Sequence, residues 1–343
     1  MMGFEHIRNI ALVPGAEVTA LADPHEPSRA WGLETVGHEI AVFDDYRDLL
    51  AAEGVDAVVI STPNFTHADI LEDVFRYPEL HVLVEKPLCT ELADCRVVEE
   101  RAAAHRGVVW VGMEYRYMPP VAEMVAELRS GSAGQLQRLA IREYRLPFLP
   151  KVGDWNRFNR NTGGTLVEKC CHFFDLMNLI VEDRPQRVYA SGAQDVNHLD
   201  ERYAGEVPDI LDNAFVIVDY ERGVRAMLDL CMFAEAARDE QEIIAVGDRG
   251  LVECSIPSGD LAVGTREGRH REKRHVPVDP EILEAGFHHG ATYYQHRAFL
   301  KAVRSGGAPE VDVRAGLLAV AIGCAAQQSI AEGRPVEMSE LGL

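Results

Sequence analysis

The chain has 343 residues, which exceeds the size of most single hydrophobic cores and predicts two domains. Hydrophobic residues make up 47% of it, as in ordinary globular proteins, and the formal net charge is -21. A chain this acidic repels phosphate backbones, so we expect no general nucleic-acid binding. No apolar run approaches the roughly 20 residues of a membrane span, so we expect no membrane partner either.

The first third of the chain alternates short apolar strands with helices. Strands are expected at 17–23, 41–43, 55–61, 81–84 and 107–112. Helices are expected at 4–13, 26–36, 45–52, 66–76 and 90–105. Apolar strands that alternate with helices are typical of a doubly wound parallel sheet, as in a Rossmann fold. We assign this α/β domain to residues 1–119.

Polar residues follow four of these strands. They are Asp23, Thr62-Pro63-Asn64, Glu85-Lys86-Pro87 and Glu114-Tyr115-Arg116. In a parallel sheet, ligands bind in the crevice beyond the carboxyl ends of the strands. The four positions therefore predict one ligand site along that edge.

The signature for a dinucleotide is incomplete. Such a domain normally opens with a strand, then G-x-G-x-x-G, then a helix. Here Gly3 opens the first helix, and Asp23 follows at close to the usual spacing of the ribose-binding acid. Gly3 would then be the third glycine, and we expect the working protein to be longer by about one strand and a turn, because these supply most of the pyrophosphate cradle. Alternatively, the chain simply begins with a helix and Asp23 is a turn residue.

From about residue 135 the pattern changes to strands with few helices between them. Strands are expected at 136–144, 187–191, 214–220, 224–231, 241–246, 251–255 and 261–263. Turn residues between several of them favour hairpins, which predicts an open, mostly antiparallel sheet. A helix at 165–181 should pack on this sheet, and two helices at 288–305 and 313–332 close the chain. We assign this α+β domain to residues 120–343.

The charge and cysteine patterns exclude other kinds of site. The basic run at 266–275 lacks interleaved aromatic residues and is interpreted as a solvated hairpin or edge strand. The seven cysteines are odd in number and form no C-x-x-C pair, so we expect neither a disulfide framework nor a metal site, and a cytoplasmic location. Adjacent Cys170 and Cys171 are interpreted as small buried hydrophobic residues.

The expected helix at 165–181 carries three titratable residues at i, i+4 and i+7, namely Glu168, His172 and Asp175. On a continuous helix they share one face, as in a helix that lines an active cleft. Two alternatives remain open. Thr165 and Glu168 also fit a capping box, and His172 and Asp175 could be solvated or paired with each other.

With these residues in place, the chain resembles the glucose–fructose oxidoreductase / inositol dehydrogenase / MocA (Gfo/Idh/MocA) family nearly end to end, lacking only the first strand. The motifs that carry the resemblance are Gly3-Phe4-Glu5-His6-Ile7-Arg8-Asn9, Thr62-Pro63-Asn64 with His67, Glu85-Lys86-Pro87, Arg116-Tyr117-Met118-Pro119 and Gly163-Gly164-x-Leu166-x-Glu168-x-x-x-His172-x-x-Asp175. The resemblance implies NAD(P)-dependent hydride transfer to or from a sugar, cyclic polyol or related derivative. A non-catalytic dinucleotide or sugar sensor on the same fold is the alternative.

The resemblance also implies roles for the catalytic residues Lys86, His172 and Glu168. The lysine and the histidine would lie beside the nicotinamide and the reacting hydroxyl. Imidazole titrates near neutrality and suits a general base, and an ammonium group stabilises a developing alkoxide. Glutamate stands at 168 where the family usually has aspartate, so Glu168 either orients the substrate or serves only as a cap.

The implied cofactor is NAD, with NADP not excluded, because Asp23 would bind the adenosine ribose and Arg29 lies too far along the chain for a 2′-phosphate. Implied cofactor-binding residues are Gly3, Asp23, Thr62, Pro63, Asn64, His67, Glu85, Lys86 and Arg116. Implied substrate-binding residues are Trp155, Arg157, Asp175 and Tyr294, although 155–161 could be only a polar loop over the sheet. The open sheet face implies a homodimer or homotetramer.

Overall fold

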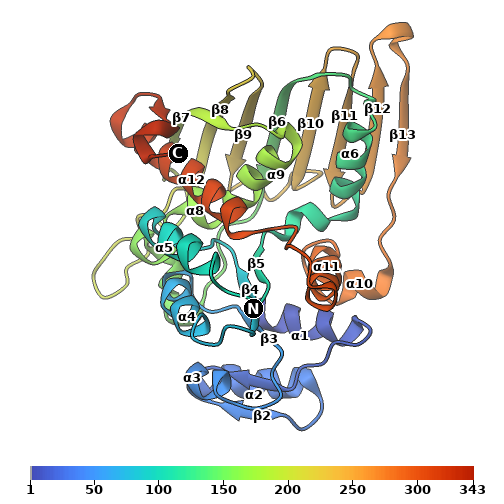
Figure 1. The fold of residues 1–343 in the computed structure, drawn as a ribbon. Coiled ribbons are helices and arrows are strands. Elements are labelled where there is room, and N and C mark those ends of the chain that lie inside the picture. Colours follow the sequence, from blue (N-terminus) through green and yellow to red (C-terminus); the bar gives the residue numbers. More distant parts are fainter. Residues whose placement is uncertain (1) are drawn as a thin grey trace.

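The computed structural model describes residues 2–343 (Figure 1). In its amino-terminal region strands and helices alternate, as predicted. Its elements are α1 (Met2–Leu12), β1 (Ala20–Ala22), α2 (Glu26–Val36), β2 (Ala41–Phe43), α3 (Tyr46–Leu50), β3 (Ala57–Ile60), α4 (His67–Val74), β4 (His81–Glu85), α5 (Leu92–Ala102) and β5 (Val109–Gly112). All strand pairs in this region are parallel, which confirms the Rossmann-like class. Continuous apolar strands such as β4 form here because helices cover both faces.

These parallel strands form two separate sheets. One contains β1 and β2, and the other has the order β3–β4–β5. A cavity of about 300 Å³ lies between β1 and β3, lined by both strands and by α1. No strand of residues 2–343 fills this place. In a doubly wound sheet, a central strand occupies this position.

The carboxyl-terminal region is built on one nine-stranded sheet. Its strands are β6 (Leu136–Tyr144), β7 (Pro185–Ala193), β8 (Asn213–Tyr220), β9 (Arg225–Cys231), β10 (Gln241–Gly247), β11 (Gly250–Ile256), β12 (Asp260–Thr265), β13 (Arg271–His275) and β14 (Val336–Glu337). They lie in the order β13–β12–β11–β10–β6–β9–β8–β7–β14, and only β6 and β9 are parallel. The open, mostly antiparallel sheet is therefore confirmed, and the basic run forms its exposed edge strand β13.

Helices cover one face of this sheet (Figure 1). They are α6 (Pro119–Arg129), α9 (Cys171–Val181) and α12 (Val313–Glu332), and α6, which the sequence did not predict, begins at the expected boundary between the two domains. The expectation that no apolar segment reaches membrane-span length is wrong for α12, which is long and apolar enough by composition. Contacts with α5, α9 and β7 explain this composition, because 61% of its apolar window is buried inside the fold.

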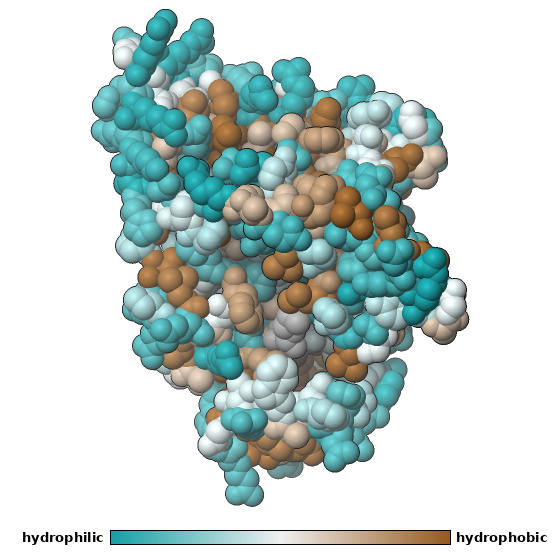
Figure 2. Space-filling model, turned by 180° about the vertical axis from the view of Figure 1, so that it is seen from behind, coloured by the Kyte–Doolittle hydropathy of each residue, from teal (hydrophilic) through white to brown (hydrophobic). Residues whose placement is uncertain are grey.

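The opposite face of the sheet carries no helix in Figure 1. Along β8 the residues alternate, so that Val216 is fully buried whereas Phe215 is 60% and Ile217 is 44% exposed. Figure 2, which views the molecule from behind, shows apolar side chains among hydrophilic ones on this side. This face is the open surface from which the sequence predicts an oligomer.

Two shorter helices connect the regions near the site. Helix α11 (Ala291–Ser305) packs on α1, and α10 (Pro280–Glu284) precedes it. The first residues of α1 therefore lie between the strands of one region and a helix that comes much later in the chain.

Candidate active site

Lys86 follows β4 at the carboxyl edge of the parallel strands. Its Nζ donates a hydrogen bond of 3.2 Å to the backbone carbonyl oxygen of Glu168. This bond joins the amino-terminal region to the glycine-rich motif of the carboxyl-terminal region. The structure therefore brings together two parts of the predicted site that are far apart in sequence.

The paired glycines set the path of the chain into the site. Gly163 has φ 79° and Gly164 has φ 88°, a backbone conformation that L side chains rarely adopt. A Cβ at Gly163 would lie 2.7 Å from the carbonyl oxygen of Thr90, so a side chain there would collide with backbone. Only glycine fits this turn, which starts helix α8 (Thr165–Glu168) directly after it.

The predicted capping box does not form. Gly164, not Thr165, is the N-cap of α8, and the hydroxyl group of Thr165 donates to the carbonyl oxygen of Leu211 at 2.6 Å. Glu168 is therefore not occupied as a cap, and the capping alternative is wrong.

The predicted helix at 165–181 is two helices. Helix α8 ends at Glu168, and α9 begins at Cys171 after a turn at Lys169 and Cys170. The prediction that Glu168, His172 and Asp175 share one face of a continuous helix is therefore wrong. Cys170 and Cys171 are fully buried, which agrees with their interpretation as small core residues.

His172 lies in the first turn of α9 and is 2% exposed. Its ring stacks on the ring of Tyr115, with centroids 3.9 Å apart and planes 5° apart. Residues 2–343 offer its Nδ1 no hydrogen-bond partner. Burial lowers the pKa of His172 well below its usual value, and the charges of Lys86 and Lys169 lower this pKa further, so the imidazole is neutral at pH 7.

Glu168 is buried beside these groups. Its Oε2 also has no hydrogen-bond partner within the described residues. Burial raises the pKa of Glu168, and the charges of Lys86 and Lys151 act against this rise. Lys151 is half-buried and was not among the predicted site residues. Its place directly after an apolar segment is the signal that could have identified it.

Asp175 and Arg116 bind each other. The guanidinium group of Arg116 donates two hydrogen bonds to the carboxylate of Asp175. One runs from Nε to Oδ2 at 2.5 Å, and the other runs from Nη2 to Oδ1. The pair connects α9 to the 3-10 helix η2 (Glu114–Tyr117) after β5. It therefore fixes the position of α9, and the roles predicted for these residues toward substrate and cofactor stay predictions.

The loop after β3 supplies further predicted residues. The ring of His67 lies between the carbonyl oxygens of Pro87, at 2.8 Å, and Thr62, at 3.2 Å, so it connects the loops after β3 and β4. Pro63 caps a short 3-10 helix, and Nδ2 of Asn64 is buried without a hydrogen-bond partner among residues 2–343. An unpartnered buried amide at the carboxyl edge of the strands suits a bound polar ligand.

Glu85 belongs to a buried network with α1 and α11. Nε2 of His6 lies 3.0 Å from Glu85 Oε1, and Nδ1 of His6 lies 2.9 Å from His296 Nε2. Burial alone would lower the pKa of His6, but the hydrogen bond and charge of Glu85 raise it. The network holds the start of α1, with Gly3 beside Ser61, against the strand end that carries Lys86.

Asp23 ends β1 at the predicted ribose site. Its Oδ1 accepts a hydrogen bond of 2.8 Å from the backbone amide of His25. Arg29 donates to the carbonyl oxygen of Asp23 at 2.6 Å. The expectation that Arg29 lies too far away is wrong, because the first turn of α2 brings it back to the end of β1.

The remaining predicted residues lie on two segments. Trp155 is half-buried and packs edge-on against Phe65, whereas Arg157 is 2% exposed and pairs with Glu201 through Nε at 3.0 Å. Tyr294 packs against Tyr293 on α11. The ion pair gives Arg157 a structural role in the loop, and the substrate roles of Trp155, Arg157 and Tyr294 stay predictions.

Among residues 2–343, one group could offer three ligand atoms to a metal ion: Glu5, Glu114 and His288. His288 Nδ1 lies 3.0 Å from Glu5 Oε1 and 3.3 Å from Glu114 Oε1. Burial alone would lower the pKa of His288, but Glu114 and Glu5 raise it to about 8. A protonated imidazole donates to carboxylates and does not ligate a metal, so the group is better described as an ion network.

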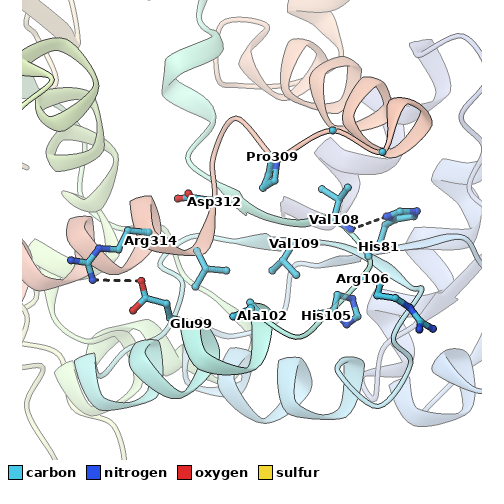
Figure 3. Close-up of a pocket in the computed structure, with 15 residues that line it drawn as sticks. His81, Glu99, Ala102, His105, Arg106, Val108, Val109, Pro309, Asp312 and Arg314 are labelled. Carbon is cyan, nitrogen blue, oxygen red and sulfur yellow. Dashed lines mark hydrogen bonds and ion pairs between the residues drawn. The ribbon is translucent and has the colours of Figure 1, made fainter.

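A separate surface pocket of about 350 Å³ lies at the other end of the parallel strands (Figure 3). It contains His81 at the start of β4, Val108 before β5, and the ion pair between Glu99 and Arg314. Because Lys86 follows the opposite end of β4, this pocket is not part of the site around His172.

Comparison with known proteins agrees with this arrangement along the whole chain. Residues 1–113 match the family described as "Oxidoreductase family, NAD-binding Rossmann fold", and residues 126–338 match "Oxidoreductase family, C-terminal alpha/beta domain". The myo-inositol 2-dehydrogenase of Thermotoga maritima is 26% identical over 341 residues, covering 99% of this chain and 96% of that protein.

Two further proteins illustrate the range of similarity. The scyllo-inositol 2-dehydrogenase (NAD(+)) of Bacillus subtilis is 24% identical over 349 residues, covering 98% of this chain and 93% of that protein. A crystal structure of an oxidoreductase domain protein from Kribbella flavida superposes with a TM-score of 0.87 at 20% identity, covering 98% of this chain and 96% of that one. At this identity the likeness to the crystal structure shows the fold.

Proposed function

The chain belongs to the Gfo/Idh/MocA family of oxidoreductases, and on that premise we propose that it transfers a hydride between NAD and a carbon atom of a cyclic polyol, sugar or related derivative. The observation that carries this proposal is that Lys86, Glu168 and His172 share one polar site, in which Glu168 and His172 are buried and the charge of Lys86 acts on both. Inositol dehydrogenases that match nearly the full chain support the class of substrate.

His172 is the proposed general base for alcohol oxidation. A base must be unprotonated before it accepts the hydroxyl proton, and burial with nearby cations keeps this imidazole neutral. In the reverse direction, the protonated ring would return the proton to the carbonyl oxygen.

Lys86 is the proposed electrostatic partner of the reacting oxygen. Its ammonium group is held against the carbonyl oxygen of Glu168, and it still has two further N–H groups to donate. A cation placed where negative charge develops stabilises the alkoxide-like transition state. The carboxylate of Glu168, with one unpartnered oxygen, would accept a hydrogen bond from a neighbouring hydroxyl group of the substrate.

The residues fit NAD in part. When bound, the nicotinamide ring supplies the acceptor or donor of the hydride. Asp23 at the end of β1 would bind the adenosine ribose, and the unpartnered amide of Asn64 offers a donor at the next strand end. Arg29 lies beside Asp23, where its guanidinium group would suit the 2′-phosphate of NADP. We nevertheless propose NAD as the preferred cofactor, and the only support for this preference is the carboxylate of Asp23. The free amide groups at the start of α1 would bind the pyrophosphate.

The alternative is a non-catalytic sensor that binds a dinucleotide or a sugar on the same fold. The presence of both Lys86 and His172 in one buried site favours the enzyme, because a sensor needs neither a base nor an alkoxide stabiliser. Free cysteines throughout support the proposal of a cytoplasmic protein, and the uncovered sheet face supports a homo-oligomer.

Fluorescence titration with NADH tests the cofactor proposal on two proteins. One is the chain as printed, and the other carries an added apolar strand and a G-x-G turn before Met1, designed to fill the cavity between β1 and β3. We expect the second to bind NADH at least tenfold more tightly, because it gains backbone amides for the pyrophosphate. Binding by neither protein contradicts the proposed function.

A panel of inositols, sugars and sugar acids, each assayed with NAD and with NADP, then identifies the substrate class. Reduction of NAD by polyols or sugars is the expected result. Turnover confined to substrates without vicinal hydroxyl groups would contradict the proposed class.

A further inference from the structure

The orientation of His172 has no hydrogen bond to explain it. A catalytic histidine is usually oriented by a hydrogen bond between its second ring nitrogen and a carboxylate or carbonyl oxygen. Here Nδ1 is buried, and the described residues offer it no partner. A ring without such a bond could rotate about χ2, which is a soft torsion in histidine. Some other contact must fix the ring if it is to act as a base.

Tyr115 provides that contact. The two rings are nearly parallel, at 5°, with centroids 3.9 Å apart, so the tyrosine covers one whole face of the imidazole. Tyr115 is itself 3% exposed and meets Phe173 edge-on at 5.7 Å. A stacked ring in a packed core opposes rotation of its partner while leaving both ring nitrogens free.

The hydroxyl group of Tyr115 is fastened from the other side. Lys169 Nζ donates to it at 2.6 Å and lies 2.8 Å from Glu143 Oε1. Lys169 occupies the turn between α8 and α9, and Glu143 lies in β6. Both side chains are almost fully buried, and removing either partner of such a pair leaves an uncompensated charge. These contacts therefore link Tyr115 in η2, Lys169 in the turn before α9 and Glu143 in β6 into one rigid group.

We infer that Tyr115 is a positioning residue for His172, and that Lys169 and Glu143 hold Tyr115 in place through its hydroxyl group. The inference rests on the proposed function, because His172 acts as a base only in that reaction. The stack replaces the usual hydrogen bond to the second nitrogen. It also excludes water from one face of the imidazole.

The charges around His172 act in the same direction. Cationic groups face it from four places: Lys86 after β4, Lys169 before α9, His288 before α11 and Arg145 after β6. The acids on its own segment are Glu168, one turn earlier, and Asp175, which Arg116 occupies. Burial under Tyr115 and these cations both favour the neutral ring, so loss of the stack should make protonation easier.

A pair of substitutions at Tyr115 separates stacking from the hydroxyl group. Tyr115→Leu removes the aromatic face, and Tyr115→Phe keeps it. In the holoenzyme, we expect Tyr115→Leu to lower kcat by roughly 10- to 100-fold, with little change in KM for the polyol, because the base is misplaced. Tyr115→Phe should lose only about fivefold, the value of one hydrogen bond.

The pH profile is the readout that a merely structural role would not move. In Tyr115→Leu the acidic limb of kcat/KM should move to higher pH, toward the usual histidine pKa of about 6.5, whereas in Tyr115→Phe it should stay in place. An unchanged kcat and an unchanged acidic limb in Tyr115→Leu would overturn the inference.

Proton NMR of the His172 ring in the cofactor-free protein keeps this test independent of activity. The ring should titrate at higher pH in Tyr115→Leu than in the unmodified protein. If the unmodified protein shows no turnover but this titration moves, then the proposed function fails and the contact between the rings stands. If Tyr115→Leu changes neither the titration of His172 nor kcat, then the positioning role fails.

A charge-balanced double substitution covers the case in which Tyr115→Leu does not fold. Lys169→Met with Glu143→Gln removes the buried ion pair as a unit and keeps the tyrosine side chain, whose hydroxyl group loses its donor. We expect His172 to titrate at higher pH, because one facing cation is lost, and kcat to fall less than in Tyr115→Leu. A titration and kcat identical to those of the unmodified protein would overturn the role of Lys169.

Discussion

Two of the three sheets, the nine-stranded sheet and the pair β1–β2, use similar apolar strands but bury them to different extents. In the nine-stranded sheet, β8 has a strand on each side, and its inward residues Val216 and Val218 are fully buried. In the amino-terminal region, β1 has a neighbour on one side only, and all three of its residues are partly exposed. The comparison teaches that apolar composition alone does not bury a strand, because β1 is apolar throughout and stays partly exposed on the edge that has no partner.

The same difference separates the two halves of the proposed site. Glu168 and His172 lie on α8 and α9, both of which are buried, and α9 packs on β6 of the complete sheet. Asp23, proposed for the adenosine end of the cofactor, directly follows β1 and lines the cavity. We therefore expect the chemistry to be pre-organised, and cofactor binding to be the step that depends on filling the cavity between β1 and β3.

The largest expected effect is on the rate of the chemical step, with cofactor binding left intact. His172→Ala should lower kcat by roughly 100-fold or more through loss of the general base, with little change in NADH affinity. The matched change on the other side, Asp23→Ala, should raise KM for NAD and leave kcat nearly unchanged. Steady-state kinetics with saturating polyol and varied NAD measures both. Unchanged turnover in His172→Ala would remove this residue from the mechanism.

The second prediction compares one leucine from each sheet. Leu228 on β9 is fully buried, so Leu228→Ala should lower the free energy of unfolding by about 3 kcal/mol. Leu21 on β1 is partly exposed and lines the cavity, so Leu21→Ala should cost less than about 1 kcal/mol. Urea unfolding of the two variants measures the difference. Equal losses would show that β1 is as well packed as the large sheet.

The third prediction concerns the junction between the regions, where His288 lies between Glu5 and Glu114. Its pKa of about 8 in the folded protein exceeds the value of about 6.5 expected when unfolded. The raised pKa therefore contributes stability that is fully present below pH 6.5 and is lost as the pH rises through 8. The side chain is 25% exposed, so we expect about 1–2 kcal/mol.

His288→Gln tests this prediction. Relative to the unmodified protein, the variant should be less stable at pH 6, and the deficit should shrink by pH 9. The difference between the two proteins is the quantity to compare, because other buried histidines such as His172 have lowered pKa values and act in the opposite direction. A deficit that is the same at both pH values would contradict the ion network.

The smallest expected effect on stability concerns the uncovered face of the complete sheet. Phe215→Lys places a charge at the most exposed apolar position of β8. If this face joins copies of the chain, sedimentation should show a shift toward the monomer, while the unfolding free energy of the subunit stays within about 0.5 kcal/mol. Glu221→Lys, in the turn after β8, is the matched control. Equal association of all three proteins would exclude this face as the interface.

Local patterns in the sequence predicted much of the fold. The apolar run that became β4 and the helix that became α2 lie close to their predicted bounds. Helix α6 was missed, although proline at its first two positions is a known start signal for a helix. The break at Lys169 and Cys170 was also missed, since nothing in the local pattern distinguishes it from a continuous helix.

The candidate site was predicted in its residue types but not in its contacts. Lys86, Glu168 and His172 were chosen from motifs, and the structure brings the segments that carry them together. Contacts that depend on side chains from distant strands were out of reach. These include the stack of Tyr115 on His172 and the pairing of Asp175 with Arg116, 59 residues away.

By itself, the sequence determined the alternation of elements and the glycine turn at 163–164, because the hydrophobic pattern and the positive φ angles depend on residues next to each other in the chain. Only the tertiary structure decided which side chains form hydrogen bonds, stacks and ion pairs with one another. It placed Lys169 against Tyr115 and Glu143, and it left the cavity between β1 and β3 open. The physical reason is that hydrogen bonds, stacks and ion pairs act over a few ångströms of space, whereas the partners here are separated by tens of residues of chain.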